Sequence, residues 1–195
     1  VKTTYADARL KDSKITLKYV QDWFSKNVGN NRQPGGTNSF VAPGVHHEYQ
    51  VDLCFFADLE KQKFKVACVC IDVLSKYAAV VPIMSKETGD VAAGIIESLE
   101  KMGRKPQIIY TDDEAALSTT ALKTYFAEQN IKHYITRKHA AFAERFVRTF
   151  KGMLYKRIDS TKNKKTETDP QWIDYVYQVM LTYNNKSVHS STRKI

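Results

Sequence analysis

The sequence predicts an α/β domain built on a mixed sheet of five strands, with helices on both faces. Three strand-like stretches follow one another with short connections, which is typical of an antiparallel meander. Further along the chain, two shorter strands alternate with segments of helical periodicity. Together the two patterns favour a mixed sheet covered by helices on both sides.

The predicted strands are short and rich in β-branched and aromatic residues. In the second strand, apolar side chains occupy both alternating positions, so this strand is expected to be central. Pro82 is expected to end the third strand, because proline cannot donate to the ladder. The five strands are predicted at residues 48–56, 65–72, 77–82, 107–111 and 132–135.

Four helices of the same domain are predicted from apolar residues at helical spacing. They cover residues 88–102, 118–130, 142–157 and 171–184. Before the first strand, residues 16–26 favour one amphipathic helix, and the glycines and proline of residues 29–36 are typical of a linker. We therefore expect an N-terminal extension over residues 1–44 and the main domain over residues 45–195.

Composition bounds the class of protein. Of the 195 residues, 43% are hydrophobic and 11% aromatic, which suffices for a packed core. No apolar run reaches about eighteen residues, so a membrane span is not expected. Cys54, Cys68 and Cys70 lie in strand-like stretches with neither disulfide nor zinc spacing, and are expected to be buried thiols.

The formal charge of +9 is concentrated in one part of the chain. Between Ile131 and Lys165, eleven Lys and Arg stand against only Glu144 and Asp159, which gives this segment a net charge of +9. A polyanion such as DNA is the natural partner of so localised a field, although a solvated basic surface has the same composition.

Two aspartates lie in or at the end of predicted strands, where the sheet could bring them close together. Asp52 interrupts an otherwise apolar strand, and Asp112 ends the fourth strand. Ligands of open α/β sheets bind at the ends of strands, and a carboxylate within a strand is costly unless a charge or hydrogen bond stabilises it. A divalent cation is one such partner.

Glu144 is a third candidate, on the helix predicted at residues 142–157. One side of that helix is expected to carry Phe142, Phe146, Phe150, Met153 and Leu154. The opposite side is expected to carry Glu144, Arg148, Lys151 and Tyr155. An ordinary pair of Glu144 with Arg148, four residues apart, would explain this arrangement without any metal.

Several ordered motifs resemble the integrase catalytic core of retroviruses, retrotransposons and related DNA elements. They are Tyr-Gln-Val-Asp-Leu at 49–53, Ile-Asp-Val-Leu-Ser-Lys-Tyr-Ala at 71–78, Tyr-Thr-Asp-Asp-Glu at 110–114, Ala-Glu-Arg-Phe-Val-Arg-Thr-Phe-Lys at 143–151 and Tyr-Asn-Asn-Lys-Ser-Val-His-Ser-Ser-Thr at 183–192. The residues of these motifs are most similar to those of integrases from DNA transposons of the Maverick/Polinton kind.

The resemblance implies a ribonuclease H-like fold and a two-metal phosphoryl transfer on DNA. Asp52, Asp112 and Glu144 would be the catalytic residues and would hold two Mg²⁺ or Mn²⁺ ions, with Asp52 bridging them. The reaction would be 3′-end processing and strand transfer by a homo-oligomer, in the nucleus or in a cytoplasmic virus-like intermediate. Residues expected to contact DNA are Lys138, Arg145, Arg148, Lys151, Lys156 and Arg157.

Three departures from the integrase pattern keep two other functions open. Asp113-Glu114 replaces the usual Asn-Gly or Lys-Gly, and Val147 replaces the Asn of the glutamate helix. Only 31 residues separate Asp112 from Glu144, and the shortening falls around residues 137–141. The first alternative is a weakened or domesticated nucleic-acid-binding module, and the second is a ribonuclease H-type nuclease.

Overall fold

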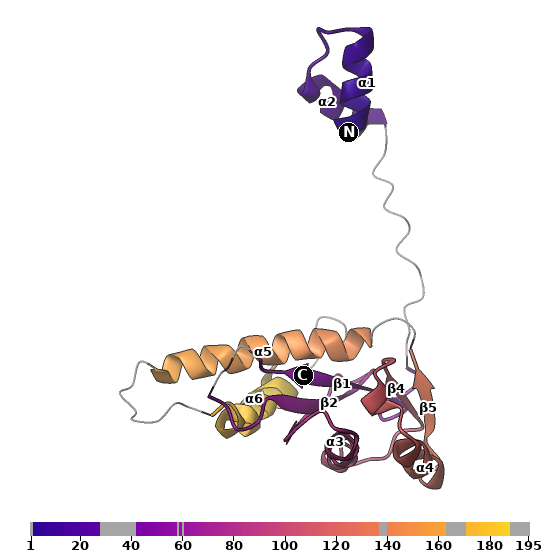
Figure 1. Ribbon diagram of the computed structural model, residues 1–195, viewed down its shortest axis with the longest axis vertical. Coiled ribbons are helices and arrows are strands. Elements are labelled where there is room, and N and C mark those ends of the chain that lie inside the picture. The colour runs from indigo at the N-terminus through magenta and orange to yellow at the C-terminus, as the bar shows by residue number, and fades with distance from the viewer. Residues whose placement is uncertain are drawn as a thin grey trace. The chain divides into compact units, whose positions relative to one another are not determined.

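The computed structural model describes residues 2–27, 42–57, 59, 61–136, 140–162 and 171–187 (Figure 1). The chain divides into two compact units, Val1–Phe40 and Val41–Ile195. The smaller unit contains helices α1 (Lys2–Lys11) and α2 (Leu17–Asn27), which pack against each other. Thr16 Oγ1 accepts the backbone N–H of Tyr19 at 3.2 Å and so caps the start of α2.

The second helix of the smaller unit agrees with the prediction, whereas the first was missed. Helix α1 has only scattered apolar residues, and Leu10 is 88% exposed, so its sequence shows no amphipathic period. Its partner α2 contributes Val20, which is 5% exposed.

The larger unit is built on a five-stranded sheet in the order β3-β2-β1-β4-β5. Strands β1 (Glu48–Phe55), β2 (Val66–Asp72) and β3 (Ala78–Ile83) pair antiparallel, as the meander pattern predicted. Strands β4 (Ile108–Thr111) and β5 (Lys132–Ile135) then add in parallel beside β1. All seven residues of β2 are buried, which confirms that it lies inside the sheet.

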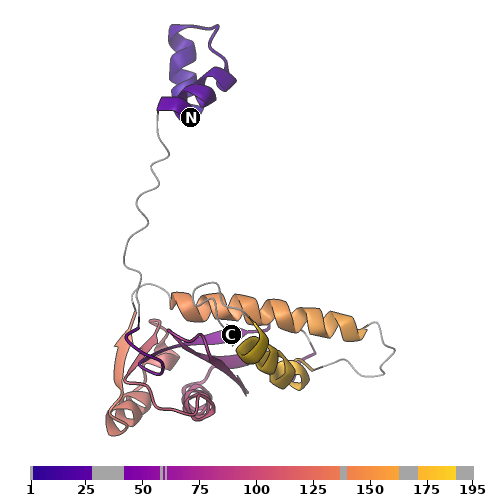
Figure 2. The same cartoon turned by 180° about the vertical axis from the view of Figure 1, so that it is seen from behind.

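Helices cover both faces of the sheet, as Figures 1 and 2 show. On one face, α3 (Thr88–Lys101) and α4 (Thr120–Glu128) cover a core that includes Val51 and Leu53. On the other face, α5 (Ala141–Lys162) and α6 (Ile173–Lys186) cover a core that includes Cys54 and Phe56. Trp172 stacks on Phe56 with ring centroids 4.2 Å apart and anchors the start of α6 in this core.

Three details differ from the sequence prediction. Pro82 does not end the third strand: β3 continues to Ile83, and Pro82 pairs with Ala67. Proline is tolerated there because β3 is an edge strand. The helix predicted at residues 118–130 is shorter, since Thr119 caps its start through Leu122 N–H at 3.3 Å and a short 3₁₀ helix, η1 (Ala115–Leu117), precedes it. Helix α5 is longer than predicted at both ends.

The three cysteines are free and buried, as expected. Within the part of the chain that the structure describes, no helix is long and apolar enough to cross a lipid bilayer.

Candidate active site

Asp52 lies in the middle of β1 and points to the face of the sheet that α5 covers. Its neighbours Val51 and Leu53 face the opposite core, and the side chains of a strand alternate between the two faces. Its carboxylate is only partly exposed. Asp52 Oδ1 accepts the backbone N–H of Leu53 at 2.8 Å.

The electrostatic environment of Asp52 links it to three other carboxylates. The pKa of Asp52 is raised to about 6, mainly by burial, although the hydrogen bond from Leu53 lowers it. The negative charges of Asp112, Glu144 and Glu114, in that order, contribute smaller parts of this rise. Because Coulombic effects of this kind fall off with distance, the four carboxylates converge on one region of the molecule.

Asp112 reaches this region because β4 runs parallel to β1. Gln50 pairs with Tyr110, so the residue that follows β4 lies near the position that Asp52 occupies on β1. Asp112 Oδ1 accepts the backbone N–H of Glu114 at 3.0 Å, which closes a local turn. This turn brings Glu114, one of the departures noted in the sequence, into the field of Asp52.

Glu144 enters from the first turn of α5 and is half-buried. The predicted division of this helix was wrong in part. The buried stripe consists of Ala143, Phe146, Phe150, Leu154 and Ile158. Glu144 therefore lies on the flank of the buried face rather than opposite it. From that flank the charge of Glu144 still raises the pKa of Asp52.

Solved structures with the same architecture include integrase catalytic cores. The catalytic core domain of HTLV-2 integrase, described in complex with magnesium in a trimeric form, matches with a TM-score of 0.64 and 19% identity, over 76% of this chain and 92% of that one. A chain of the simian T-cell lymphotropic virus intasome in complex with PP2A regulatory subunit B56 gamma matches with a TM-score of 0.65 and 17% identity, over 76% of this chain and 52% of that one. The core domain of BIV integrase matches with 0.55 and 13%, over 75% and 88%.

The chain has the fold of a retroviral integrase catalytic core. The predicted ribonuclease H-like fold is thereby confirmed. No protein-family model matches the sequence.

Curated relatives come from transposable elements. The retrovirus-related Pol polyprotein from transposon 297 of Drosophila melanogaster is 24% identical over 140 residues, which is 71% of this chain and 13% of that protein. A putative uncharacterized transposon-derived protein of Caenorhabditis elegans is 27% identical over 119 residues, which is 60% and 40% respectively. The chain thus spans less than half the length of either relative. The narrower resemblance to Maverick/Polinton elements stays a prediction.

The carboxylates of this integrase-like core suit a hard divalent cation chemically. Asp52, Asp112 and Glu144 supply only oxygen atoms, and their mutual repulsion is the kind that a cation relieves. Among the described residues, no three His, Cys, Asp or Glu side chains already lie close enough to hold a metal ion. Binding would therefore require these side chains to draw together.

Four of the predicted DNA-contacting residues project from α5 into solvent. They are Arg145, Arg148, Lys156 and Arg157. Lys151 differs from them, because it is half-buried and its Nζ lies 5.5 Å from the ring centroid of Phe56. It was predicted to share the solvent side with Tyr155, whose hydroxyl is also buried. Lys138 lies outside the described residues.

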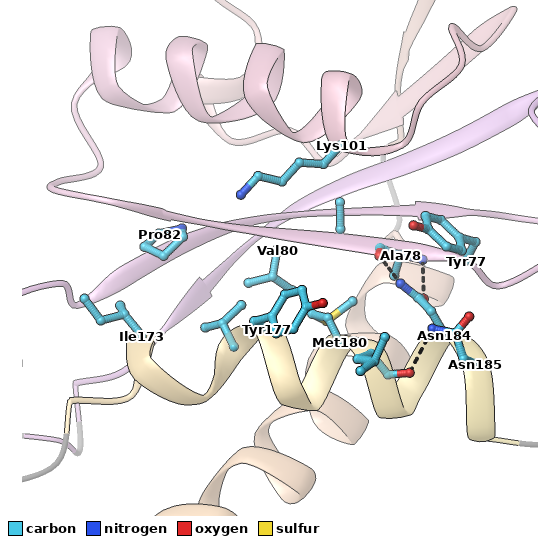
Figure 3. Close-up of a pocket in the computed structure, with 13 residues that line it drawn as sticks. Tyr77, Ala78, Val80, Pro82, Lys101, Ile173, Tyr177, Met180, Asn184 and Asn185 are labelled. Atoms are coloured by element: carbon cyan, nitrogen blue, oxygen red, sulfur yellow. Dashed lines mark hydrogen bonds between the residues drawn. The ribbon is translucent and has the colours of Figure 1, made fainter.

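A groove of about 530 Å³ lies away from the carboxylates, between the edge strand β3 and α6 (Figure 3). Asn184 joins the two elements: its Oδ1 accepts the N–H of Ala78 at 3.0 Å and its Nδ2 donates to the carbonyl of Ala78 at 2.9 Å. The walls are mostly apolar and include Tyr177 and Leu181, which are 75% and 46% exposed.

Proposed function

We propose that the chain is a metal-dependent polynucleotidyl transferase that processes DNA 3′ ends and joins them to a second DNA. The observation that supports this proposal is the placement of three carboxylates: Asp52 on β1, Asp112 at the end of the adjacent parallel strand β4, and Glu144 in the first turn of α5, with the charges of the last two acting on Asp52. The integrase core fold and the transposon relatives support it. We further propose that residues 45–195 carry the activity and that residues 1–44 form an N-terminal extension.

Asp52, Asp112 and Glu144 would together hold two Mg²⁺ or Mn²⁺ ions. Metal held by these carboxylates would supply the positive charge that lowers the pKa of a water molecule or 3′-hydroxyl and offsets the charge on the leaving oxygen of an in-line displacement at phosphorus. The protein's own part is to present three carboxylates from three separate elements. Hydrogen bonds from Leu53 to Asp52 and from Glu114 to Asp112 orient one oxygen of each aspartate.

DNA would lie along α5, where Arg145 and Arg148 are near Glu144 and Lys156 and Arg157 lie further along the same helix. Each cation that meets a phosphate releases counterions, so binding should weaken steeply with salt. Acting on DNA places the protein in the nucleus or in a cytoplasmic virus-like intermediate.

A homo-oligomer is also proposed, because joining two DNA ends requires at least two active sites. The HTLV-2 core is described in dimeric and trimeric forms. The helices that start near Ser118 and Gln171 are candidate contact surfaces, because both are rich in aromatic residues. Of these, α6 exposes Tyr177 and Leu181, which makes it the stronger candidate.

Glu114 favours one second candidate, a nucleic-acid-binding module with weakened catalysis. Its negative charge acts on Asp52, in a position where a glycine would leave room for a phosphate. An added negative charge beside DNA opposes binding of the scissile phosphate and strengthens the need for metal.

One assay separates these functions. A labelled DNA duplex is incubated with the full chain and Mg²⁺, and both 3′-end cleavage and strand-transfer products are measured. We expect both products from the parent and neither from Asp52→Asn, Asp112→Asn or Glu144→Gln. Asp113→Asn, which changes an exposed neighbour of Asp112, should retain them. DNA binding without any product from the parent would favour the binding module. An RNA–DNA hybrid is incubated in parallel. Cleavage of this hybrid without any product from the DNA duplex would favour the nuclease.

A further inference from the structure

The first turn of α5 is capped by a side chain from a distant strand. Gln50, on β1, is 7% exposed, and its Oε1 accepts the backbone N–H groups of Phe142 at 2.9 Å and Ala143 at 3.3 Å. The first N–H groups of a helix have no partner within the helix. Ala140, which precedes α5, has no side-chain acceptor of its own. Gln50 therefore replaces the local cap that the sequence lacks.

This cap connects two of the proposed metal ligands. Gln50 and Asp52 lie two residues apart on the same strand and therefore on the same face of the sheet. Glu144 follows the capped amides of Phe142 and Ala143 directly in the helix. One buried amide thus ties the strand of the first carboxylate to the helix turn of the third.

The first turn of α5 is also contacted by Lys76, which lies in the turn after β2. Asp72, which is fully buried, organises the tight turn after β2 by accepting the N–H of Leu74 at 2.9 Å. Within this turn Lys76 has a φ of 67°, and its Nζ donates to the carbonyl of Val73. That ammonium lies 3.9 Å from the ring centroid of Phe142, where it makes a cation–π contact.

We propose that Gln50 is a positioning residue for metal binding, which it serves by fixing the first turn of α5 so that Glu144 faces Asp52. This inference rests on the proposed function. Partners that orient metal ligands without touching the metal affect affinity strongly: losing one typically weakens metal binding about 10- to 100-fold. Here the effect would pass through the helix backbone, because without the cap the first turn can fray and carry Glu144 away.

The test compares two glutamines, Gln50 and Gln62, whose side-chain oxygens each accept a backbone N–H at the start of a different helix. Gln62 Oε1 accepts the backbone N–H of Trp172 at 2.7 Å, at the start of α6, which bears none of the three carboxylates. Methionine is close to glutamine in length but lacks the amide. Mg²⁺ is titrated by calorimetry into the full chain, into Gln50→Met and into Gln62→Met. We expect Mg²⁺ affinity to fall about 10- to 100-fold in Gln50→Met and to stay at the parental value in Gln62→Met.

Amide hydrogen exchange provides a readout independent of metal. In the parent, the N–H groups of Phe142 and Ala143 should exchange slowly. Gln50→Glu keeps an acceptor oxygen and should retain both this protection and Mg²⁺ affinity within a few-fold. Rapid exchange of both amides in the parent would overturn the inference, even if Gln50→Met failed to fold.

The remaining outcomes separate this inference from the proposed function. Parental Mg²⁺ affinity in Gln50→Met, or an equal loss in Gln62→Met, would reject the positioning role and leave the proposed function standing. A parent that binds no Mg²⁺ would reject the proposed function itself, and the inference with it.

Discussion

Replacing Asp52 with asparagine should stabilise the metal-free protein at neutral pH. The negative charge of Asp52 is disfavoured by burial and by the charges of Asp112, Glu144 and Glu114. Asparagine removes the charge but keeps a side-chain oxygen that can accept the N–H of Leu53. The variant that abolishes the proposed catalysis should therefore melt at a higher temperature than the parent.

The size of the effect follows from the pKa of Asp52. Folding raises this pKa from the ordinary 3.8 to about 6. At about 1.4 kcal/mol per pKa unit, the ionised carboxylate costs the folded state at most about 3 kcal/mol. For an acid with a raised pKa, the folded state is favoured in full below pH ~4, and this advantage is lost as the pH rises through about 6. The gain in melting temperature at neutral pH should then be about 2–4 °C per kcal/mol.

The measurement is thermal unfolding in a chelator, followed by circular dichroism between pH 4 and pH 8. The melting temperatures of the parent and Asp52→Asn should coincide near pH 4, separate as the pH rises from 4 to about 6, and keep a constant difference above that. Asp113→Asn is the control, because Asp113 is exposed and is not among the charges that raise the pKa of Asp52. A constant difference between parent and Asp52→Asn across the whole pH range would refute the reasoning.

Three further predictions follow from the packing and the exposed charges. Gly94→Ala in α3 should destabilise the fold by about 1–3 kcal/mol in denaturant unfolding, because a Cβ there would lie 2.5 Å from Cγ2 of Ile83. Arg148→Ala should lower the salt slope of DNA binding by about one unit, measured as affinity against ionic strength, since its exposed guanidinium flanks Glu144 on α5. Tyr177→Lys should weaken self-association in sedimentation, because it places a charge on the exposed apolar rim of the β3–α6 groove.

Each of these has a matched control. Gly152→Ala lies in α5, where the added Cβ would meet no atom within 4 Å apart from the neighbouring residues and backbone of its own helix, so it should stabilise by about 0.5–1 kcal/mol. Lys101→Ala removes a cation that pairs with Glu97 on the opposite face of the sheet and should leave the salt slope unchanged. Tyr134→Lys alters an exposed tyrosine of β5 and should not affect association. An equal response of variant and control in any pair would contradict the corresponding prediction.

The sequence alone determined the order of the elements in the core and the type of nearly every one of them. Apolar residues recur every two positions in a strand and about every 3.6 positions in a helix. This spacing indicates which face of each element is buried. The same periodicity could not find α1, whose apolar residues are too few to mark a face. It also could not tell that β3 lies at the edge of the sheet, which is what lets the strand continue through Pro82.

The motifs named Asp52, Asp112 and Glu144, and only the tertiary structure decided how these residues relate. The parallel pairing of β1 with β4 brings Asp112 near Asp52, and the rotation of α5 leaves Glu144 half-buried on the flank of the buried face instead of opposite it.

The residue that the sequence could not reveal is Gln50, because its partners at Phe142 and Ala143 are more than ninety positions away. Local patterns record burial and propensity within a few residues. A cap that joins a strand to a distant helix forms only once the strand and the helix have packed together. No local sequence pattern can therefore predict it.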